Sequence, residues 1–201
     1  MSLHPYICIY NRDQNRSNYL KGVKTMKQKI TVIVSLVAVI TMIWWFPFSE
    51  GGVVNAYSYN GYKQCTYYVD WRWGGNITSV HKDGFQQALT DWNGAQSKRR
   101  FKNGGSSAPG ALDSYKSESD YLNGKAIYYH DSRKCITSWV AKLNSINTKT
   151  YTHSRSTGNH ELGHILGLAH TNNRAIMNTK RNRNEIYRPQ TDDINGINNL
   201  Y

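Results

Sequence analysis

The chain contains segments in which apolar and polar residues alternate, a pattern that predicts strands. In residues 65–73, CTYYVDWRW, most apolar side chains recur at every second position, with Thr66, Asp70 and Arg72 on the opposite face. A period of two is typical of a half-buried strand. Residues 125–130 and 135–143 are also strand-like. They are apolar in both phases, so we expect a sheet that is covered on more than one side.

Three other segments predict helices. The apolar residues of 83–97 follow the spacing of an amphipathic helix, and a second helix is expected at about 157–168. The last run, 191–201, predicts a closing helix that Thr191 caps. The order of strand, helix, strands, helix and helix indicates an α+β or α/β class. Two segments are expected as loops: residues 103–124, with room for one short strand, and residues 169–190.

One long apolar run does not fit a globular domain. Residues 30–48 carry no charge, Lys27 and Lys29 precede them, and small residues follow up to Ala56. A positive start, an apolar stretch and small residues before a cleavage point describe a secretory signal peptide. The alternative is an uncleaved membrane anchor with the rest of the protein outside, because a run of this length can just span a bilayer.

This run divides the chain into three parts. We expect residues 1–25 to be a dispensable or misassigned extension, because Met26 is a better signal-peptide start than anything upstream. Residues 26–56 are then the signal peptide, and residues 57–201 form one secreted domain. The three parts therefore predict that the domain works outside the cytoplasm.

The cysteines and the charge of the chain indicate an oxidising compartment and argue against a nucleic-acid partner. Cys65 and Cys135 lie in the predicted secreted domain, so we expect one disulfide, with two buried thiols as the alternative. The formal net charge is +12, and the basic clusters at 98–102 and 180–183 are interpreted as solvated surface. Both clusters have the character of helix ends and loops and not of a nucleic-acid interface, so no nucleic-acid partner is expected. Attraction to an anionic cell surface stays open.

The candidate chemistry lies in one short motif, HELGHILGLAH, which begins at His160. His160 and His164 are one helical turn apart, so both imidazoles can reach one ion. Gly167 lets the chain leave the helix with a positive φ, and His170 can then return as a third ligand. Three protein ligands leave a fourth position for water, which is the arrangement of catalytic zinc. Glu161 can lie beside that water as general base and later as general acid.

This motif resembles the metzincin zinc-peptidase signature. Residues 174–178, RAIMN, resemble the Met-turn, with Met177 under the metal, and residues 187–201 are similar to the closing helix of matrixin catalytic domains. The resemblance implies an α+β zincin fold with a twisted, mainly parallel mixed sheet. It also implies two long helices above a zinc cleft and a small C-terminal subdomain that ends in a helix.

We therefore expect a secreted zinc-dependent endopeptidase of matrixin-like type. It would hydrolyse peptide bonds of a protein or peptide substrate through a metal-bound water that Glu161 activates, and it would act as a monomer. One catalytic Zn²⁺ is expected, whereas Ca²⁺ stays open because no ligand spacing marks a calcium site. The alternative is a secreted or surface-attached binding protein on the same fold with little turnover.

The resemblance also suggests roles for residues around the motif. Asp193 is expected to hydrogen-bond toward the Met-turn, the alternative being a simple charge at a helix start. Tyr187 or Ile176 is expected to line the pocket that follows the scissile bond. By fold analogy alone, the strand at 126–130 is an edge that pairs with an extended substrate. The remaining histidines and one acid are expected as ordinary loop or strand residues: His81, His130, Asp131 and His153.

Overall fold

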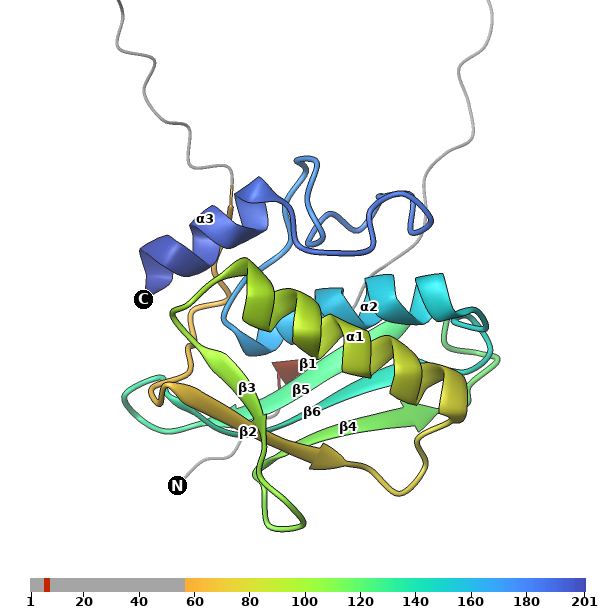
Figure 1. Ribbon diagram of the computed structural model, residues 1–201, viewed down its shortest axis with the longest axis horizontal. Helices are drawn as coiled ribbons and strands as arrows, with labels where there is room; N and C mark the ends of the chain where they lie inside the picture. The colour runs from red at the N-terminus through yellow and green to blue at the C-terminus, as the bar shows by residue number, and fades with distance from the viewer. Residues whose placement is uncertain (1–5, 8–56) are drawn as a thin grey trace, which may run out of the picture. The chain divides into compact units, whose positions relative to one another are not determined.

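The computed structural model describes residues 6–7 and 57–201, which form one sheet and three helices (Figure 1). The strands are β1 (Tyr6–Ile7), β2 (Tyr68–Trp73), β3 (Arg100–Asn103), β4 (Gly110–Tyr115), β5 (Gly124–His130) and β6 (Ile136–Asn144). The helices are α1 (Ser79–Ala95), α2 (Tyr151–Ile165) and α3 (Thr191–Leu200). Both the predicted signal peptide at 26–56 and the predicted extension at 1–25, apart from β1, lie outside the described residues. None of the described helices combines the length and apolar character needed to cross a membrane.

The sheet is mixed and mainly parallel. Its strand order is β1-β5-β6-β4-β2-β3, and β6, β4, β2 and β3 run parallel to one another. β5 is antiparallel to β6, and β1 adds to the outer side of β5, again antiparallel. The predicted α+β class with a mainly parallel mixed sheet is therefore confirmed.

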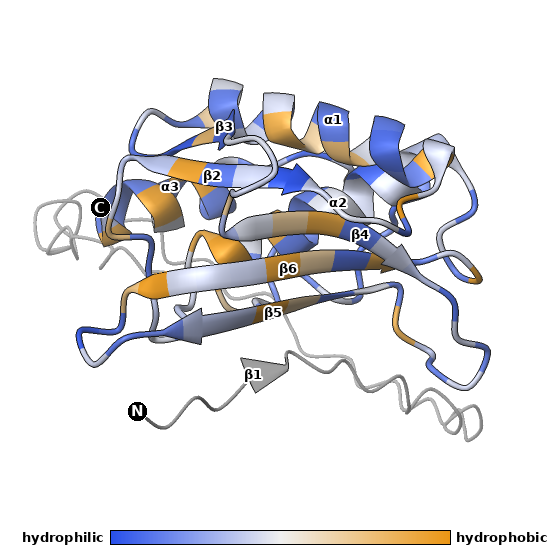
Figure 2. Cartoon of the chain, turned by 90° about the horizontal axis from the view of Figure 1, so that it is seen from below, coloured by the Kyte–Doolittle hydropathy of each residue, from blue (hydrophilic) through white to orange (hydrophobic). Residues whose placement is uncertain are grey.

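Both long helices cover the same face of the sheet (Figures 1 and 2). The apolar stripe of α1 packs against α2, with Phe85 and Trp92 completely buried. Gly84 and Gly158 let the two helices approach closely, because a side chain at Gly84 would collide with Ser154. The opposite face has no helix over it among the described residues, so the expectation of a sheet covered on more than one side is wrong (Figure 2).

The segment expected at 103–124 as a loop with room for one short strand contains the buried strand β4, which lies in the interior of the sheet. Its first residue, Gly110, lies under the ring of Trp139, where any Cβ would overlap the indole. Glycine, serine and proline around this strand give it the composition of a loop, although tertiary packing makes it a central strand.

The boundaries of α2 and α3 also differ from the expected ones. α2 begins at Tyr151, whereas the sequence predicts a start near 157. The first residues of α2 are mostly polar and several of them are buried, so no apolar period marks the start of the helix. Ser156, for example, donates a hydrogen bond to Ile186 O at 2.7 Å. Helix α3 is capped by Gln190 and not by Thr191. Gln190 and Asp193 form a capping box in which each side chain accepts from the other residue's backbone N–H.

His81 is neither a loop nor a strand residue, contrary to expectation. It lies in α1, completely buried, with Nε2 2.9 Å from Thr148 O and Nδ1 2.6 Å from Ser114 Oγ. A carbonyl only accepts, so Nε2 donates and Nδ1 accepts from the Ser114 hydroxyl. Burial lowers the pKa of His81, so the ring is neutral. His153 also differs from expectation, since it lies in α2.

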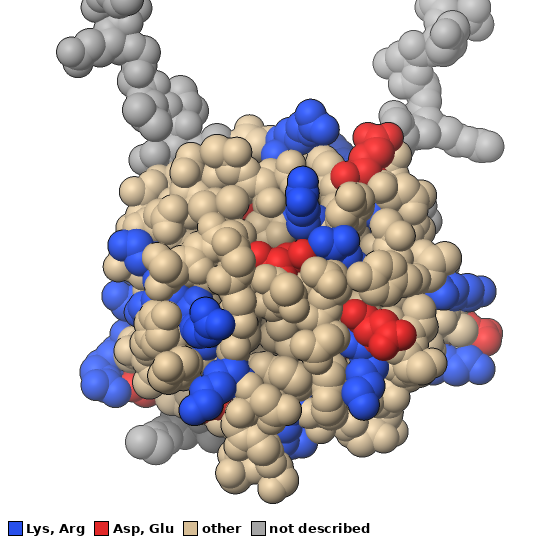
Figure 3. Space-filling model, in the orientation of Figure 1, with Lys and Arg blue, Asp and Glu red and all other residues tan. Residues whose placement is uncertain are grey.

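The expected disulfide is confirmed. It joins Cys65 to Cys135, with a Cα–Cα distance of 5.4 Å, and so links the segment before β2 to the start of β6. On the face of the molecule in Figure 3, Lys and Arg side chains are spread among neutral ones, with acidic side chains between them. The excess positive charge is therefore not gathered into one stripe on that face.

Candidate metal centre

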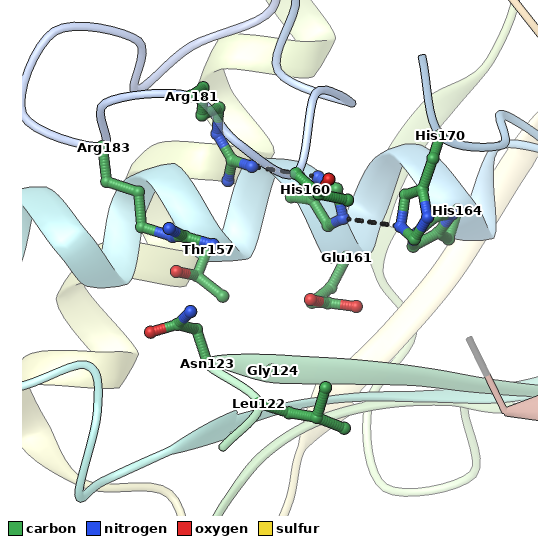
Figure 4. A pocket seen from close by; sticks show the side chains of 11 residues that line it. Leu122, Asn123, Gly124, Thr157, His160, Glu161, His164, His170, Arg181 and Arg183 are labelled. Atoms are coloured by element: carbon green, nitrogen blue, oxygen red, sulfur yellow. Dashed lines mark hydrogen bonds between the residues drawn. The ribbon is translucent and has the colours of Figure 1, made fainter. Parts of the chain in front are cut away.

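The three motif histidines meet at one point. Their ligand atoms all lie within 4.8 Å of one another, and His170 Nε2 is 3.2 Å from His160 Nε2 and 3.1 Å from His164 Nε2 (Figure 4). His160 and His164 stand one turn apart on α2, as their spacing predicts. Gly167 has φ +99° just after the helix, and this left-handed residue turns the chain back toward His170.

Backbone carbonyls fix the tautomers of two of these rings. His160 Nδ1 lies 2.8 Å from Ile176 O, and His164 Nδ1 lies 2.8 Å from Leu168 O. Because a carbonyl cannot donate, both Nδ1 atoms carry the proton and both Nε2 atoms present a lone pair. Burial lowers the pKa of His164 to about 3 and that of His160 well below its ordinary value. The rings are therefore neutral, as metal ligands must be.

This donor set fits a zinc ion. Lone pairs of neighbouring imidazoles that converge at about 3 Å repel one another unless a cation lies between them. Three neutral imidazole nitrogens on one side of a point are the ligand set of several catalytic zinc sites, which keep a fourth position open. The two carbonyls behind the rings supply the outer hydrogen bonds that orient such ligands.

Glu161 lies beside the three histidines, with its side chain directed toward the start of β5 (Figure 4). It is 4 % exposed, and burial raises its pKa to about 8, although Arg181 and Arg183 act in the opposite direction. Gly124 leaves room for this carboxylate, because a Cβ there would be 2.8 Å from Glu161 Oε1. The hollow between Glu161 and the histidines measures about 20 Å³, room for one water molecule.

The turn at 174–178 supports the site from below. Met177 is buried, and its sulfur lies against Gly163 of α2, where no side chain would fit. Asp193 of α3 accepts hydrogen bonds from Ile176 N at 2.7 Å and Met177 N at 3.1 Å. The predicted bond from Asp193 toward this turn is therefore present. It connects the closing helix to the carbonyl that orients His160.

Arg181 has a different role from the one expected for the cluster at 180–183. It is only 6 % exposed, so the interpretation of this cluster as solvated surface is wrong for this residue. Its guanidinium donates to Ser156 O at 3.0 Å and to Asn178 O at 3.0 Å. It also lies 3.2 Å from His160 Nδ1, whose own proton goes to Ile176 O. Arg181 thus ties the loop after the turn to α2.

Two pocket residues are misplaced by the sequence. Neither Tyr187 nor Ile176 lines the hollow: Ile176 is fully buried, and the ring of Tyr187 packs on Arg155 at 4.6 Å. The expectation that one of them forms a wall of the site is therefore wrong. The wall opposite Glu161 is instead formed by the residues that lead into β5, Leu122–Gly124.

Sequence reasoning also missed the residues that hold the end of α2. Asn60 Nδ2 donates to His164 O at 2.9 Å, Gln64 Nε2 to Ile165 O at 3.1 Å, and Tyr201 Oη to Leu166 O at 2.9 Å. These carbonyls belong to the last turn of the helix, where carbonyls commonly lack a helical partner, although His164 O also accepts from Gly167 N at 3.0 Å. The partners come from both ends of the described chain, and no local sequence signal marks them.

Residues 113–201 match the family model of the matrixin peptidases. Over these residues the chain is similar to the matrixin-like metzincins. The match includes the three histidines, Glu161 and the Met177 turn, and the family is one of zinc-dependent metallopeptidases. The matrixin-like protein has no match among curated proteins.

Proposed function

We propose that this matrixin-like protein is a secreted endopeptidase that hydrolyses peptide bonds with Glu161 as proton carrier. The observation that carries the proposal is the convergence of three histidine Nε2 atoms beside one buried carboxylate, in a hollow with room for one water. A pure binding protein has no need of a buried carboxylate at that position, because burying it costs free energy.

The residues divide the chemistry between them. His160, His164 and His170 would hold the zinc ion, which when bound lowers the pKa of water and polarises a carbonyl oxygen. Glu161 takes a proton from the attacking water and hands it to the amine that leaves. Gly124 leaves room for this carboxylate at the start of β5.

Secretion belongs to the same proposal. The apolar run at 30–48, the small residues before Ala56 and the disulfide between Cys65 and Cys135 support it, since disulfides persist in oxidising compartments. Identification of Tyr57 as the N-terminus of protein recovered from the medium would agree with cleavage after Ala56. Recovery only from membranes, with residues 30–48 still attached, would favour the anchored alternative.

The deciding experiment is hydrolysis of quenched-fluorescent casein by the purified protein. Wild type should cleave it, lose activity with a zinc chelator and regain it with zinc. Glu161→Ala should keep one zinc per chain and lose at least about 100-fold in turnover, whereas His164→Ala should also lose zinc. Glu185→Ala, at an exposed residue of the 178–190 loop, is the control. Zinc-loaded wild type without cleavage would contradict the proposal and favour the binding protein.

A further inference from the structure

A second, larger hollow opens beside the metal centre. It has a volume of about 530 Å³ and shares Asn123, Thr179, Arg181 and Arg183 with the hollow that contains Glu161. The two hollows are therefore adjacent. The larger hollow is lined by Tyr121, Asn123, Asn147, His153, Thr179, Lys180, Arg181, Asn182, Arg183 and Asn184.

The chemistry of this lining is cationic. It includes Lys180, Arg181 and Arg183, while its other members are amides, a hydroxyl, a phenol and one imidazole, with no carboxylate among them. Glu185, an acid of the same loop, is exposed and accepts a hydrogen bond from Asn182 at 2.7 Å. A substrate side chain that enters the hollow therefore meets positive charge and hydrogen-bond donors, and little apolar surface.

Of the two arginines, Arg183 is the more exposed. Arg181 is buried and donates to Ser156 O and Asn178 O. Arg183 is half-buried, and in Figure 4 its side chain extends from the loop over Thr157 toward Asn123. It thus forms the passage between the larger hollow and the hollow of Glu161.

The balance of charge at this passage favours an anion. Arg181 and Arg183 line the same hollow, so their positive charges repel each other. Glu161 is the acid of the adjoining hollow and is reserved for proton transfer. An additional carboxylate from a ligand would relieve the repulsion between the two arginines.

The direction of a bound chain follows from the sheet. β1 pairs with β5 antiparallel, with Tyr6 opposite Tyr128 and Ile7 opposite Ile127. A peptide that takes the place of β1 on this edge, in the same direction, runs from the His130 end toward Gly124, below Glu161. Its residues beyond Gly124 continue toward Tyr121 and Asn123, which line the larger hollow. The residue after the scissile bond therefore enters the cationic hollow.

We infer that the protein selects substrates with an acidic residue, Asp or Glu, directly after the scissile bond, and that Arg183, aided by Lys180, recognises its carboxylate. This inference rests on the proposed peptidase function and adds the substrate class to it. A guanidinium can form two parallel hydrogen bonds to a carboxylate, which makes Arg183 the stronger determinant and Lys180 the weaker one.

The test uses quenched-fluorescent peptides built on a casein cleavage site mapped by mass spectrometry. They differ only at the residue after the scissile bond, which is Glu, Gln, Lys or Leu. Wild type should cleave the Glu peptide with a kcat/KM about tenfold above that of the Gln peptide, the range of a charge-assisted hydrogen bond. This ratio should fall as salt is raised, because part of the hollow is open to solvent. Glu placed before the scissile bond should give no such preference.

Substitutions test which residues cause the preference for Glu over Gln. Arg183→Gln should reduce the Glu-to-Gln ratio to near one, Arg183→Lys should give an intermediate ratio, and Arg183→Glu should favour the Lys peptide. Lys180→Gln should reduce the ratio by about twofold. Arg188→Gln, at an exposed arginine outside the hollow, should leave the ratio and the activity unchanged. Zinc content and the thermal midpoint show whether each variant is folded.

The outcomes separate this inference from the proposed function. Equal cleavage of the Glu and Gln peptides by wild type would overturn the inference and leave the peptidase function intact. A tenfold preference that survives both Arg183→Gln and Lys180→Gln would overturn the recognition by these residues. Failure of zinc-loaded wild type to cleave any peptide or casein would overturn the proposed function, and this inference with it.

Discussion

Asp193 is the residue whose replacement tests most directly how the closing helix supports the metal centre. Its carboxylate is 1 % exposed and accepts three backbone hydrogen bonds. Oδ2 accepts from Ile176 N at 2.7 Å and from Gln190 N at 2.8 Å, and Oδ1 accepts from Met177 N at 3.1 Å. Two of these N–H groups lie in buried backbone at the turn below the histidines, where water cannot replace the acceptor.

The expected loss in the free energy of unfolding follows from these three hydrogen bonds. Asp193→Ala leaves two buried N–H groups without an acceptor, each at about 1–3 kcal/mol, and removes the bond to Gln190. We expect a loss of about 3–5 kcal/mol in the free energy of unfolding, a large part of a typical total. Asp193→Asn can keep the two bonds at the Oδ2 position, but its amide then faces Met177 N–H donor to donor. It should lose about 1–3 kcal/mol.

Urea denaturation of zinc-loaded wild type, Asp193→Asn and Asp193→Ala measures these losses, and zinc affinity measured on the same proteins shows whether the turn moves. Both variants should bind zinc more weakly, because the turn carries the Ile176 carbonyl that orients His160. Asp192→Asn is the matched control. Its Oδ1 accepts only a long bond from Asn173 Nδ2, at 3.3 Å, so its effect should stay below about 1 kcal/mol. Equal stability of the Asp192 and Asp193 variants would refute the reasoning.

Three further changes have measurable outcomes. Gly124→Ala should lower kcat roughly tenfold or more, because the new Cβ would be 2.8 Å from Glu161 Oε1 and 2.9 Å from a carbonyl of β6; unchanged kinetics would show that the carboxylate moves freely. Wild type should lose thermal stability as pH falls below about 6.5. His81 binds a proton there in the unfolded chain but not in the folded protein, where burial lowers its pKa, so His81→Gln should reduce the loss. Reduction of the bond between Cys65 and Cys135, which are 70 residues apart, should lower the free energy of unfolding by about 4 kcal/mol in urea denaturation; a loss below about 1 kcal/mol would show that the unfolded chain is already compact there.

The sequence predicts the three histidines of the metal centre because they are brought together by neighbouring residues of the chain. His160 and His164 are brought together by one helical turn, and Gly167 allows the reversal that returns His170, so eleven consecutive residues contain the whole donor set. The alternating strands and the stripe of α1 were predictable for the same reason. A period of two or of 3.6 residues needs no knowledge of the partner against which it packs.

The parts that the sequence did not predict depend on distant partners. β4 has the composition of a loop and becomes a strand because Gly110 accommodates the ring of Trp139. The start of α2 is hidden because its buried face is polar, with Ser156 bonded to Ile186 O. Arg181 has the local setting of a surface cation and is buried because α2 and the 178–190 loop supply its acceptors.

Contacts with residues distant in the sequence also hold the metal centre in place. They are needed because His170, the last ligand, follows the end of a helix. Helix ends fray because their final carbonyls lack partners. In this protein three carbonyls at the end of α2 accept hydrogen bonds from the side chains of Asn60, Gln64 and Tyr201. The Cys65–Cys135 disulfide fixes the segment that carries Gln64. The position of His170 relative to α2 therefore depends on both ends of the domain being folded. Metal binding and folding of the domain should be coupled, so a chelator should lower the unfolding temperature as well as the activity.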